Sequence, residues 1–285
     1  MERSFARTDL AAEALMQRLS AAAELIPGAE AEEKTMYGFP VSRVSIISDD
    51  AAKAIGKPKG KYLTLELDKY VNRREASFSD AALCLSELLR SFDEIKSAKS
   101  FLVACLGNKD ITPDALGPDA ADSIIVTRHL KSGMPEAFAG FSSVSVLRTG
   151  VLGTTGIESA ETLRAVCRAV DPGCVIAIDA LASGELRRLC RNVQICDSGI
   201  SPGSGVGNDR SALNRELLGV PVIAVGVPTV IDAAVFTDED SAKGLFVTPR
   251  NIDELIRSTA KLIAYGINLA VHEGLSLDDV EMLIE

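Results

Sequence analysis

Short apolar runs alternate with amphipathic segments along most of the chain. The apolar runs are rich in Val, Ile, Leu and Ala, have the length of buried strands and end at polar or glycine-containing residues. They lie at 101–106, 144–147, 174–178, 193–196 and 221–227. Apolar residues recur at helical spacing in the segments 78–92, 118–130, 157–170 and 251–265. Strands that alternate with helices predict a mostly parallel sheet wrapped by helices, which is an α/β fold.

Residues 1–70 show a different pattern. Apolar residues at helical spacing predict a helix over 9–25, which Thr8 or Asp9 can cap. Two extended segments, 36–47 and 60–68, then follow each other without a long helix between them, so they are expected to form an antiparallel extension. The chain shows no internal repeat and no clear linker. We therefore expect one domain over 1–285, with 1–70 as an N-terminal elaboration.

Composition and charge exclude several classes of function. The net charge is −10 and the pI is about 4.9, whereas a protein that grips nucleic acid through phosphates usually has a basic surface. The chain has no apolar run of about 18 residues and no apolar segment near its start, so neither a membrane span nor a secretory signal is expected. The 6 cysteines form no CxxC pair, and with only 2 histidines they predict no zinc site and no Cys-His nucleophile. A reducing, intracellular compartment is expected, with no metal and no cofactor.

Two aspartates are the strongest candidates for chemistry. The tripeptide Asp-Ala-Leu follows a predicted strand twice, at Asp114 and at Asp179. Ligands of open α/β sheets bind at the carboxyl ends of strands, where both carboxylates are expected to lie. Two aspartates in near contact share a proton, so that one can activate water while the other donates a proton, which suffices for peptide hydrolysis. Spacing alone leaves an alternative open, and favours it: Asp114 caps the following helix and Asp179 caps a turn.

A second group of polar residues lies at other predicted strand ends and helix starts. Asn108 follows the strand at 101–106, and carboxylates stand near such ends at Asp110, Glu158 and Asp197. Helix-dipole and Asx-turn roles explain them equally well, and nothing in their spacing demands a divalent cation. The stretch PGSGVGN is glycine-rich at Gly203, Gly205 and Gly207, but it matches neither GxxxxGK[ST] nor GxGxxG. It is interpreted as a plain loop or as a backbone nest for a substrate carbonyl.

Long motifs in the same order along the chain carry a family resemblance. They read ARTDLAAEA, GKYLTLE, GNKDITPDALGP, IVTRHL, GTTGIES, VIAIDALAS, DSGISPGSGVGN, LGVPVIAVGVPTVIDA and LIAYGINLAVH. Together they resemble the germination protease (spore endopeptidase) family over nearly the whole chain. The resemblance implies an α/β/α sandwich similar to that of the hydrogenase maturation proteases, a phosphorylase/hydrolase-like fold. It also implies an atypical aspartic mechanism whose two aspartates correspond to Asp114 and Asp179.

The resemblance further implies a substrate and a mode of control. Germination proteases degrade small acid-soluble spore proteins in the cytoplasm of the spore core, form homotetramers and are made as zymogens. Only residues 1–7 precede Thr8, so any propeptide is short. The segment between Ala233 and Val247 is also short where some family members carry an insertion. Two alternatives stay open: a maturation-type protease that recognises a metal-loaded partner, and an inactive family member that binds spore proteins or a small ligand through PGSGVGN.

Overall fold

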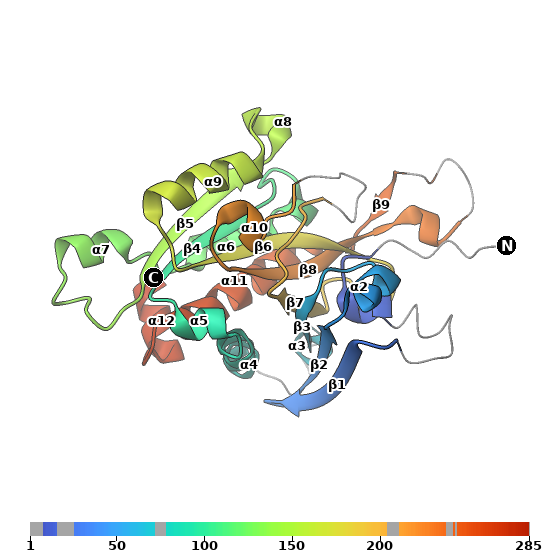
Figure 1. Ribbon diagram of the computed structural model, residues 1–285, viewed down its shortest axis with the longest axis horizontal. Coiled ribbons are helices and arrows are strands. Elements are labelled where there is room, and N and C mark those ends of the chain that lie inside the picture. The colour runs from blue at the N-terminus through green and yellow to red at the C-terminus, as the bar shows by residue number, and fades with distance from the viewer. Residues whose placement is uncertain are drawn as a thin grey trace.

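A mixed sheet of nine strands, covered by helices on both faces, forms the centre of the protein in this computed structural model (Figure 1). The structure describes residues 8–15, 26–71, 78–203, 211–237, 242 and 244–284. The strand order is β1-β2-β3-β7-β8-β6-β4-β5, and β9 pairs with β8 off this path. The strands are β1 (Ala29–Met36), β2 (Phe39–Ile46), β3 (Gly60–Glu66), β4 (Ser100–Leu106), β5 (Ser143–Gly150), β6 (Cys174–Ser183), β7 (Asn192–Cys196), β8 (Val222–Asp232) and β9 (Phe246–Val247).

Parallel and antiparallel pairings divide the sheet into two halves. Strands β5, β4, β6 and β8 pair in parallel, as the alternation of strands and helices predicts. In the other half, each strand in the order β1, β2, β3, β7, β8 is antiparallel to the next. Strand β9 is also antiparallel to β8. The α/β class is therefore confirmed. The sheet is mixed and not mostly parallel as expected, because β1, β7 and β9 join the two segments expected from the sequence in its antiparallel part.

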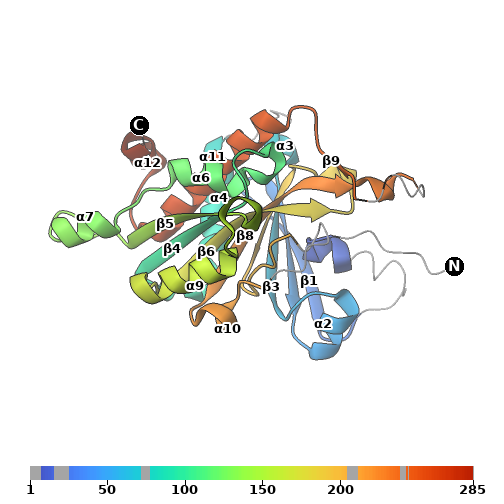
Figure 2. The ribbon, with the colours of Figure 1, turned by 90° about the horizontal axis from the view of Figure 1, so that it is seen from above.

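Helices cover both faces of the sheet, and apolar side chains of the strands pack against them on each face. The faces are closed by α4 and α11 on one side and by α9, with α2 and the helix at 11–15, on the other. Seen from above, α9 lies over the parallel strands and α2 over the antiparallel end (Figure 2). The α/β/α sandwich is thus confirmed. The longer helices are α2 (Asp49–Ile55), α4 (Phe78–Arg90), α9 (Ser159–Val170), α11 (Ile252–Val271) and α12 (Leu277–Ile284). The shorter ones are α3 (Asp68–Val71), α5 (Asp93–Ser97), α6 (Leu116–Ala120), α7 (Arg128–Gly133), α8 (Leu152–Thr155) and α10 (Arg215–Leu218).

The central strands are buried on both faces, which explains their unbroken apolar sequences. In β6, Ile176 packs on the side of α4 and α11, whereas the next residue, Ala177, packs on the side of α9. Ile176 pairs with Val103 of β4 and with Ile223 of β8, and all three are fully buried. Strands covered on both sides need apolar residues at every position, and alternation is lost.

The helix predicted over 118–130 is wrong. Helix α6 ends at Ala120, a single 3₁₀ turn (Ala121–Ser123) follows, and the chain is then extended until α7 begins at Arg128. The side chain of Asn268 on α11 explains the break. Its Nδ2 donates to the Ser123 carbonyl at 2.8 Å, and its Oδ1 accepts from the Ile125 N–H at 3.0 Å. These contacts satisfy backbone groups that a continuous helix would have paired.

Strand β1, which forms the first hairpin with β2, was not among the strands predicted from the sequence. Its residues, AEAEEKTM, are mostly exposed, and it lies at the edge of the sheet. A strand with solvent on both faces shows no apolar alternation, so the pattern indicated only its partner β2. The helix predicted over 9–25 is described only at 11–15, and the rest of that segment lies outside the described residues.

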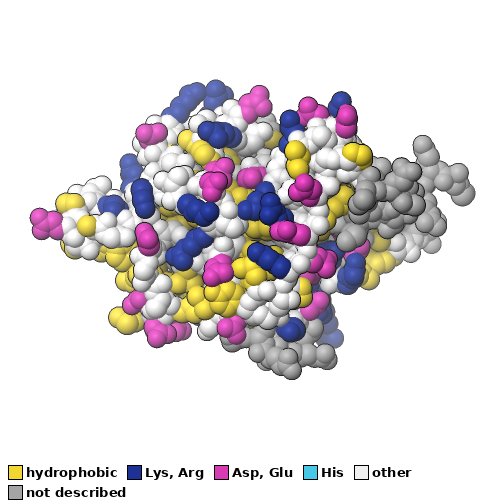
Figure 3. Space-filling view, turned by 60° about the horizontal axis from the view of Figure 1, so that its bottom comes forward, with side chains coloured by type: hydrophobic (Ala, Val, Ile, Leu, Met, Phe, Trp, Pro, Cys, Tyr) yellow, Lys and Arg dark blue, Asp and Glu magenta, His cyan; other side chains and the backbone are white. Residues whose placement is uncertain are grey.

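The described surface carries charges of both signs. On the face shown in Figure 3, acidic and basic side chains are interspersed, and the described residues of that face form no continuous basic stripe. Within the described chain, no helix is both long and apolar enough to cross a membrane.

Candidate active site

A cavity of about 460 Å³ lies at the carboxyl ends of β4 and β6. Its wall includes the side chains of Asp114 and Asp179, the two aspartates singled out from the sequence. The wall also includes residues at the end of β8, Gly203, and Phe246 and Thr248 of the segment that follows β8. Asp9, near the start of the chain, lines it as well. Much of the remaining wall is apolar, since Leu106, Ile111, Pro113, Val151, Leu181 and Val230 also line it. The site is therefore a pair of carboxylates in a mainly apolar pocket.

Asp114 is held by the tight loop that follows β4. This loop turns at Gly107, which has a φ of +108°, and returns through a 3₁₀ turn (Thr112–Asp114). The N–H of Asn108 donates to the Asp114 Oδ2 at 2.8 Å and to the Asp114 carbonyl at 3.1 Å. A Cβ on Gly107 would lie 2.0 Å from that carbonyl oxygen, so this close approach requires glycine. The N-cap of α6 is Ala115, without a side-chain cap, so the capping role considered for Asp114 is wrong.

Asp179 lies within a strand, and the turn-capping role considered for it is also wrong. Strand β6 continues past the predicted end at 178 as far as Ser183, and Asp179 pairs in register with Gly226 of β8. The side chain is only 4% exposed, and its Oδ1 accepts from the Ala180 N–H at 3.0 Å. Because Ile178 is the last residue that pairs with β4, Asp179 stands just where β4 leaves the ladder and turns toward the Asp114 loop.

The remaining residues predicted from the sequence divide into two groups. Asn108 supports Asp114 as described, and Gly203 lines the cavity, whereas Gly205 and Gly207 lie outside the described residues. The three other carboxylates do not line the cavity. Asp110 is exposed. The side chain of Asp197 accepts a hydrogen bond of 2.8 Å from the N–H of Lys61, which lies on β3. Glu158 precedes α9 without making a capping hydrogen bond, although its neighbour Ser159 does line the cavity.

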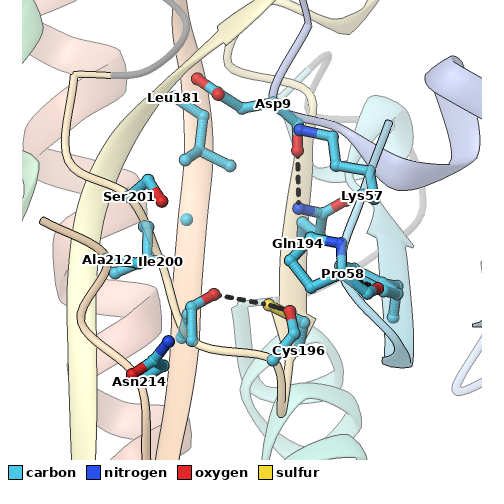
Figure 4. A pocket seen from close by; sticks show the side chains of 15 residues that line it. Asp9, Lys57, Pro58, Leu181, Gln194, Cys196, Ile200, Ser201, Ala212 and Asn214 are labelled. Atoms are coloured by element: carbon cyan, nitrogen blue, oxygen red, sulfur yellow. Dashed lines mark hydrogen bonds between the residues drawn. The ribbon is translucent and has the colours of Figure 1, made fainter. Parts of the chain in front are cut away.

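Asp9 is a cavity residue that the sequence reasoning did not select. Its N–H donates to the Ala182 carbonyl at 3.0 Å, and its Oδ2 accepts from the Ala182 N–H at 2.8 Å, which fixes the N-terminal segment beside β6. Asp9 and Leu181 also line a second, smaller cavity of about 150 Å³, shown in Figure 4. There Gln194 donates to the Asp9 carbonyl at 3.2 Å, and burial lowers the pKa of Lys57 while the charge of Asp9 opposes this shift. The motif ARTDLAAEA, already noted for its resemblance, was the available signal for Asp9.

Three hydroxyl side chains complete the polar wall of the larger cavity. Ser159 donates to the Gly150 carbonyl at 3.3 Å, and Thr248 donates to the Thr229 carbonyl at 2.9 Å. The hydroxyl of Thr229 itself is buried and has no hydrogen-bond partner among the described residues. Apart from its place in the motif GVPTV, no pattern in the sequence points to Thr229.

Other chemistry-bearing side chains lie away from this cavity. All 6 cysteines are buried and unpaired, and His272 is fully buried with its Nε2 3.4 Å from the Ile125 carbonyl. Burial lowers the pKa of His272 and raises the pKa of Cys105 to about 12. Among the described residues, no three His, Cys, Asp or Glu side chains are grouped so that they could hold a metal ion.

Known proteins are similar to this sequence over most of its length. The profile of the germination protease family matches residues 6–243. The germination protease of Caldanaerobacter subterraneus subsp. tengcongensis is 40% identical over 319 aligned positions, covering 98% of each chain. That of Clostridium perfringens is 35% identical with the same coverage, and that of Priestia megaterium is 40% identical over 90% of this chain and 70% of its own. An alignment of 319 positions exceeds the 285 residues of this chain, so that relative carries residues without a counterpart here.

Among solved structures, the [NiFe] hydrogenase maturation protease HycI from Thermococcus kodakarensis KOD1 is similar with a TM-score of 0.39 and 21% identity, covering 63% of this chain and 98% of its own. The sequence relationships are much closer than this structural one. Because the profile of one family matches residues 6–243 and a relative aligned over 98% of both chains is 40% identical, the chain belongs to the germination protease family and is a peptidase.

Proposed function

We propose that this peptidase cleaves small acid-soluble spore proteins during germination and uses Asp114 and Asp179 as its catalytic pair. The observation that carries the proposal is that both carboxylates line one cavity although 65 positions separate them in the sequence, from 114 to 179. The pocket lies where α/β proteins place their ligands, at the carboxyl ends of parallel strands. The substrate itself comes from the family relationship.

The proposed reaction needs only water and the two carboxyl groups. One aspartate, ionised, takes a proton from water as the water oxygen forms a bond to the carbonyl carbon of the scissile peptide. The other, protonated, then gives its proton to the amide nitrogen, and the C–N bond breaks to release an acid and an amine. The two residues end with their protonation states exchanged, and a proton passed through solvent restores them. The largely apolar wall strengthens these interactions, because it keeps the local dielectric low.

The supporting residues hold this pair in place. The N–H of Asn108 donates to Asp114, and Gly107 lets the loop approach closely enough for that contact. Gly203 contributes backbone to the cavity wall. We assign these residues a positioning role. Asp110, Glu158 and Asp197 do not line the cavity and have no part in the proposed site.

Control and assembly are part of the same proposal. Residues 1–7 would act as a short propeptide, and their removal would leave a new N-terminus close to Asp9 in the cavity wall. The protein would act in the cytoplasm of the spore core as a homotetramer, as the family resemblance implies. No metal or cofactor takes part in the proposed steps.

The test is cleavage of a purified small acid-soluble spore protein, followed by mass spectrometry of the fragments. Asp114→Asn and Asp179→Asn should each lower the rate by about 100- to 10,000-fold, the contribution typical of a general acid or base. Asp110→Asn is the matched control, because Asp110 lies on the same loop as Asp114 but is exposed and outside the cavity. Its rate should stay within about twofold of wild type, as for exposed surface substitutions.

Two results would contradict the proposal. Full turnover by either asparagine variant at the cavity would exclude the pair. A loss of cleavage on adding a chelator, restored by a divalent metal, would instead favour the maturation-type alternative, in which the carboxylates recognise a metal-loaded partner.

A further inference from the structure

We propose that the hydroxyl of Thr229 donates a hydrogen bond to the carbonyl oxygen of the scissile peptide bond and stabilises the negative charge that develops there. The inference rests on the proposed function, because it assumes that a peptide is cleaved in the cavity of Asp114 and Asp179. It adds a catalytic residue for which neither the family profile nor the sequence pattern gives a role.

The first observation is that the Thr229 hydroxyl is buried and unsatisfied within the described part of the chain. Thr229 is 1% exposed, and its Oγ1 has no hydrogen-bond partner among the described residues. A buried hydroxyl without a partner costs free energy, and native structures contain few of them. Thr229 belongs to the wall of the cavity, so a bound molecule is the partner that could satisfy this group.

The second observation is an irregularity of the sheet at this residue. Leu181 of β6 pairs with Pro228 of β8, and the next residue of β6, Ala182, pairs with Val230. Thr229 is therefore skipped in the ladder and forms a bulge. Bulges re-aim side chains and are frequent next to active sites. The bulge separates the residue from the regular alternation that fixes the side chains of its neighbours.

The third observation is that the backbone on both sides of this side chain is held. The N–H of Cys190 donates to the Pro228 carbonyl at 2.7 Å, and the Thr248 hydroxyl donates to the Thr229 carbonyl at 2.9 Å. A donor on a fixed backbone needs little reorganisation when charge develops, which is the condition for strong electrostatic stabilisation. Thr248 thus acts as a positioning residue for Thr229.

The composition of the cavity wall leaves Thr229 as the side chain suited to this role. The described residues that line the cavity include no lysine and no arginine. The hydroxyls of Ser159 and Thr248 already donate to the carbonyls of Gly150 and Thr229. The carboxylates of Asp114 and Asp179 serve in proton transfer, so the Thr229 hydroxyl is the uncommitted side-chain donor for an oxyanion among these described residues.

The geometry requires one local movement. The Oγ1 is covered in this structure, and a rotation about the χ1 bond exchanges the hydroxyl and the methyl group of a threonine between staggered positions. Substrate would supply the partner that favours the rotated side chain.

The experiment compares Thr229→Val, which removes the hydroxyl but keeps the shape, with Thr229→Ser, which keeps the hydroxyl. Cleavage of a purified small acid-soluble spore protein is measured as kcat and KM. Thr229→Val should lower kcat by about 100-fold, the typical effect of losing one oxyanion donor, with KM within about twofold of wild type. Thr229→Ser should restore most of kcat, which a purely structural role of the methyl group would not explain.

The chain offers a matched control in Thr259 on α11. Thr259 is also 1% exposed, and its hydroxyl also has no partner among the described residues, but it does not line the cavity. Thr259→Val should leave kcat unchanged. Circular dichroism and thermal unfolding check the fold of each variant. If Thr229→Val does not fold, Thr229→Ala and Thr229→Ser provide the same comparison of hydroxyl absent and present.

The outcomes separate the inference from the proposal on which it rests. Wild-type cleavage with an unchanged kcat in Thr229→Val would overturn the inference alone. An equal loss in the alanine and serine variants would also overturn it, because the hydroxyl would then not matter. Failure of the wild type to cleave the substrate in the same series would overturn the proposed function and the inference with it.

Discussion

Gly117 joins the candidate site to the sheet, and replacing it with alanine is the sharpest structural test of the site. An added Cβ would lie 2.3 Å from the Leu106 carbonyl oxygen, 2.7 Å from the Leu106 nitrogen and 2.9 Å from the Ile178 carbonyl oxygen. All three are backbone atoms of central strands and cannot swing aside. Ordinary contact begins at 3.4 Å, so α6 would have to move away from β4 and β6 by about 1 Å.

The expected magnitude follows from that displacement. Overpacking a well-packed interior costs about 1–3 kcal/mol, and the rigid neighbours here place Gly117→Ala at the upper end, near 3 kcal/mol. Helix α6 begins two residues after Asp114, so its movement should also displace that carboxylate. A misplacement of about 1 Å in a catalytic geometry can lower the rate by about 100-fold. We therefore expect a less stable protein with a strongly reduced kcat.

The assay combines urea unfolding, followed by circular dichroism, with initial rates of substrate cleavage. Gly133→Ala is the control, because Gly133 is also helical but a Cβ there would meet no atom within 4 Å. That variant should be within about 1 kcal/mol of wild type, on the stable side, because alanine favours helix. A Gly117→Ala protein with the wild-type unfolding midpoint and full activity would refute the close docking of α6.

Two further predictions concern buried groups outside the cavity. Burial lowers the pKa of His272 from 6.5, so below that pH the unfolded chain binds a proton that the folded protein excludes. Stability should be complete above about pH 6.5 and fall with decreasing pH by up to about 1.4 kcal/mol per pH unit. Thermal unfolding from pH 7.5 to 5.5 should show this slope in wild type and in the exposed-site variant His129→Gln, and its persistence in His272→Gln would exclude this origin. All 6 thiols are buried, and burial raises the pKa of four of them to about 12, so a thiol reagent at pH 8 should label none before denaturation and all afterwards. Rapid labelling of the native protein would contradict their burial.

The sequence predicts well the strands that are buried on both faces and the helices that pack one apolar face against the sheet. The segments 101–106, 174–178 and 222–225 of the central strands are apolar at every position because helices cover both faces. Helix α4 and helix α11 have a clear apolar face. In contrast, β1 is polar because it is an exposed edge, and the segment after Ala120 is apolar but not helical because Asn268 binds its backbone. Edge position and long-range hydrogen bonds leave no periodic trace in the chain.

The site was predictable to a similar extent. Asp114 and Asp179 stand out because each follows an apolar run of the sequence, and both line the cavity at the carboxyl-terminal side of the parallel strands, although β6 continues past Asp179 to Ser183. Asp9 and Thr229 show no such local signal. Asp9 reaches the cavity through hydrogen bonds to Ala182, 173 positions away, and Thr229 through a bulge that no periodicity reveals. Spacing therefore identifies residues that depend on strand ends and misses those that depend on pairing between distant segments.

The docking of Asp9 against Ala182 has a consequence for the newly made protein. Asp9 leaves the ribosome early, whereas its partner on β6 and the end of β8 are synthesised much later. The cavity wall thus contains residues from the first and last thirds of the chain, and contacts so far apart form only when most of the domain has folded. A partly synthesised chain that lacks the end of β8 would therefore have no complete cavity.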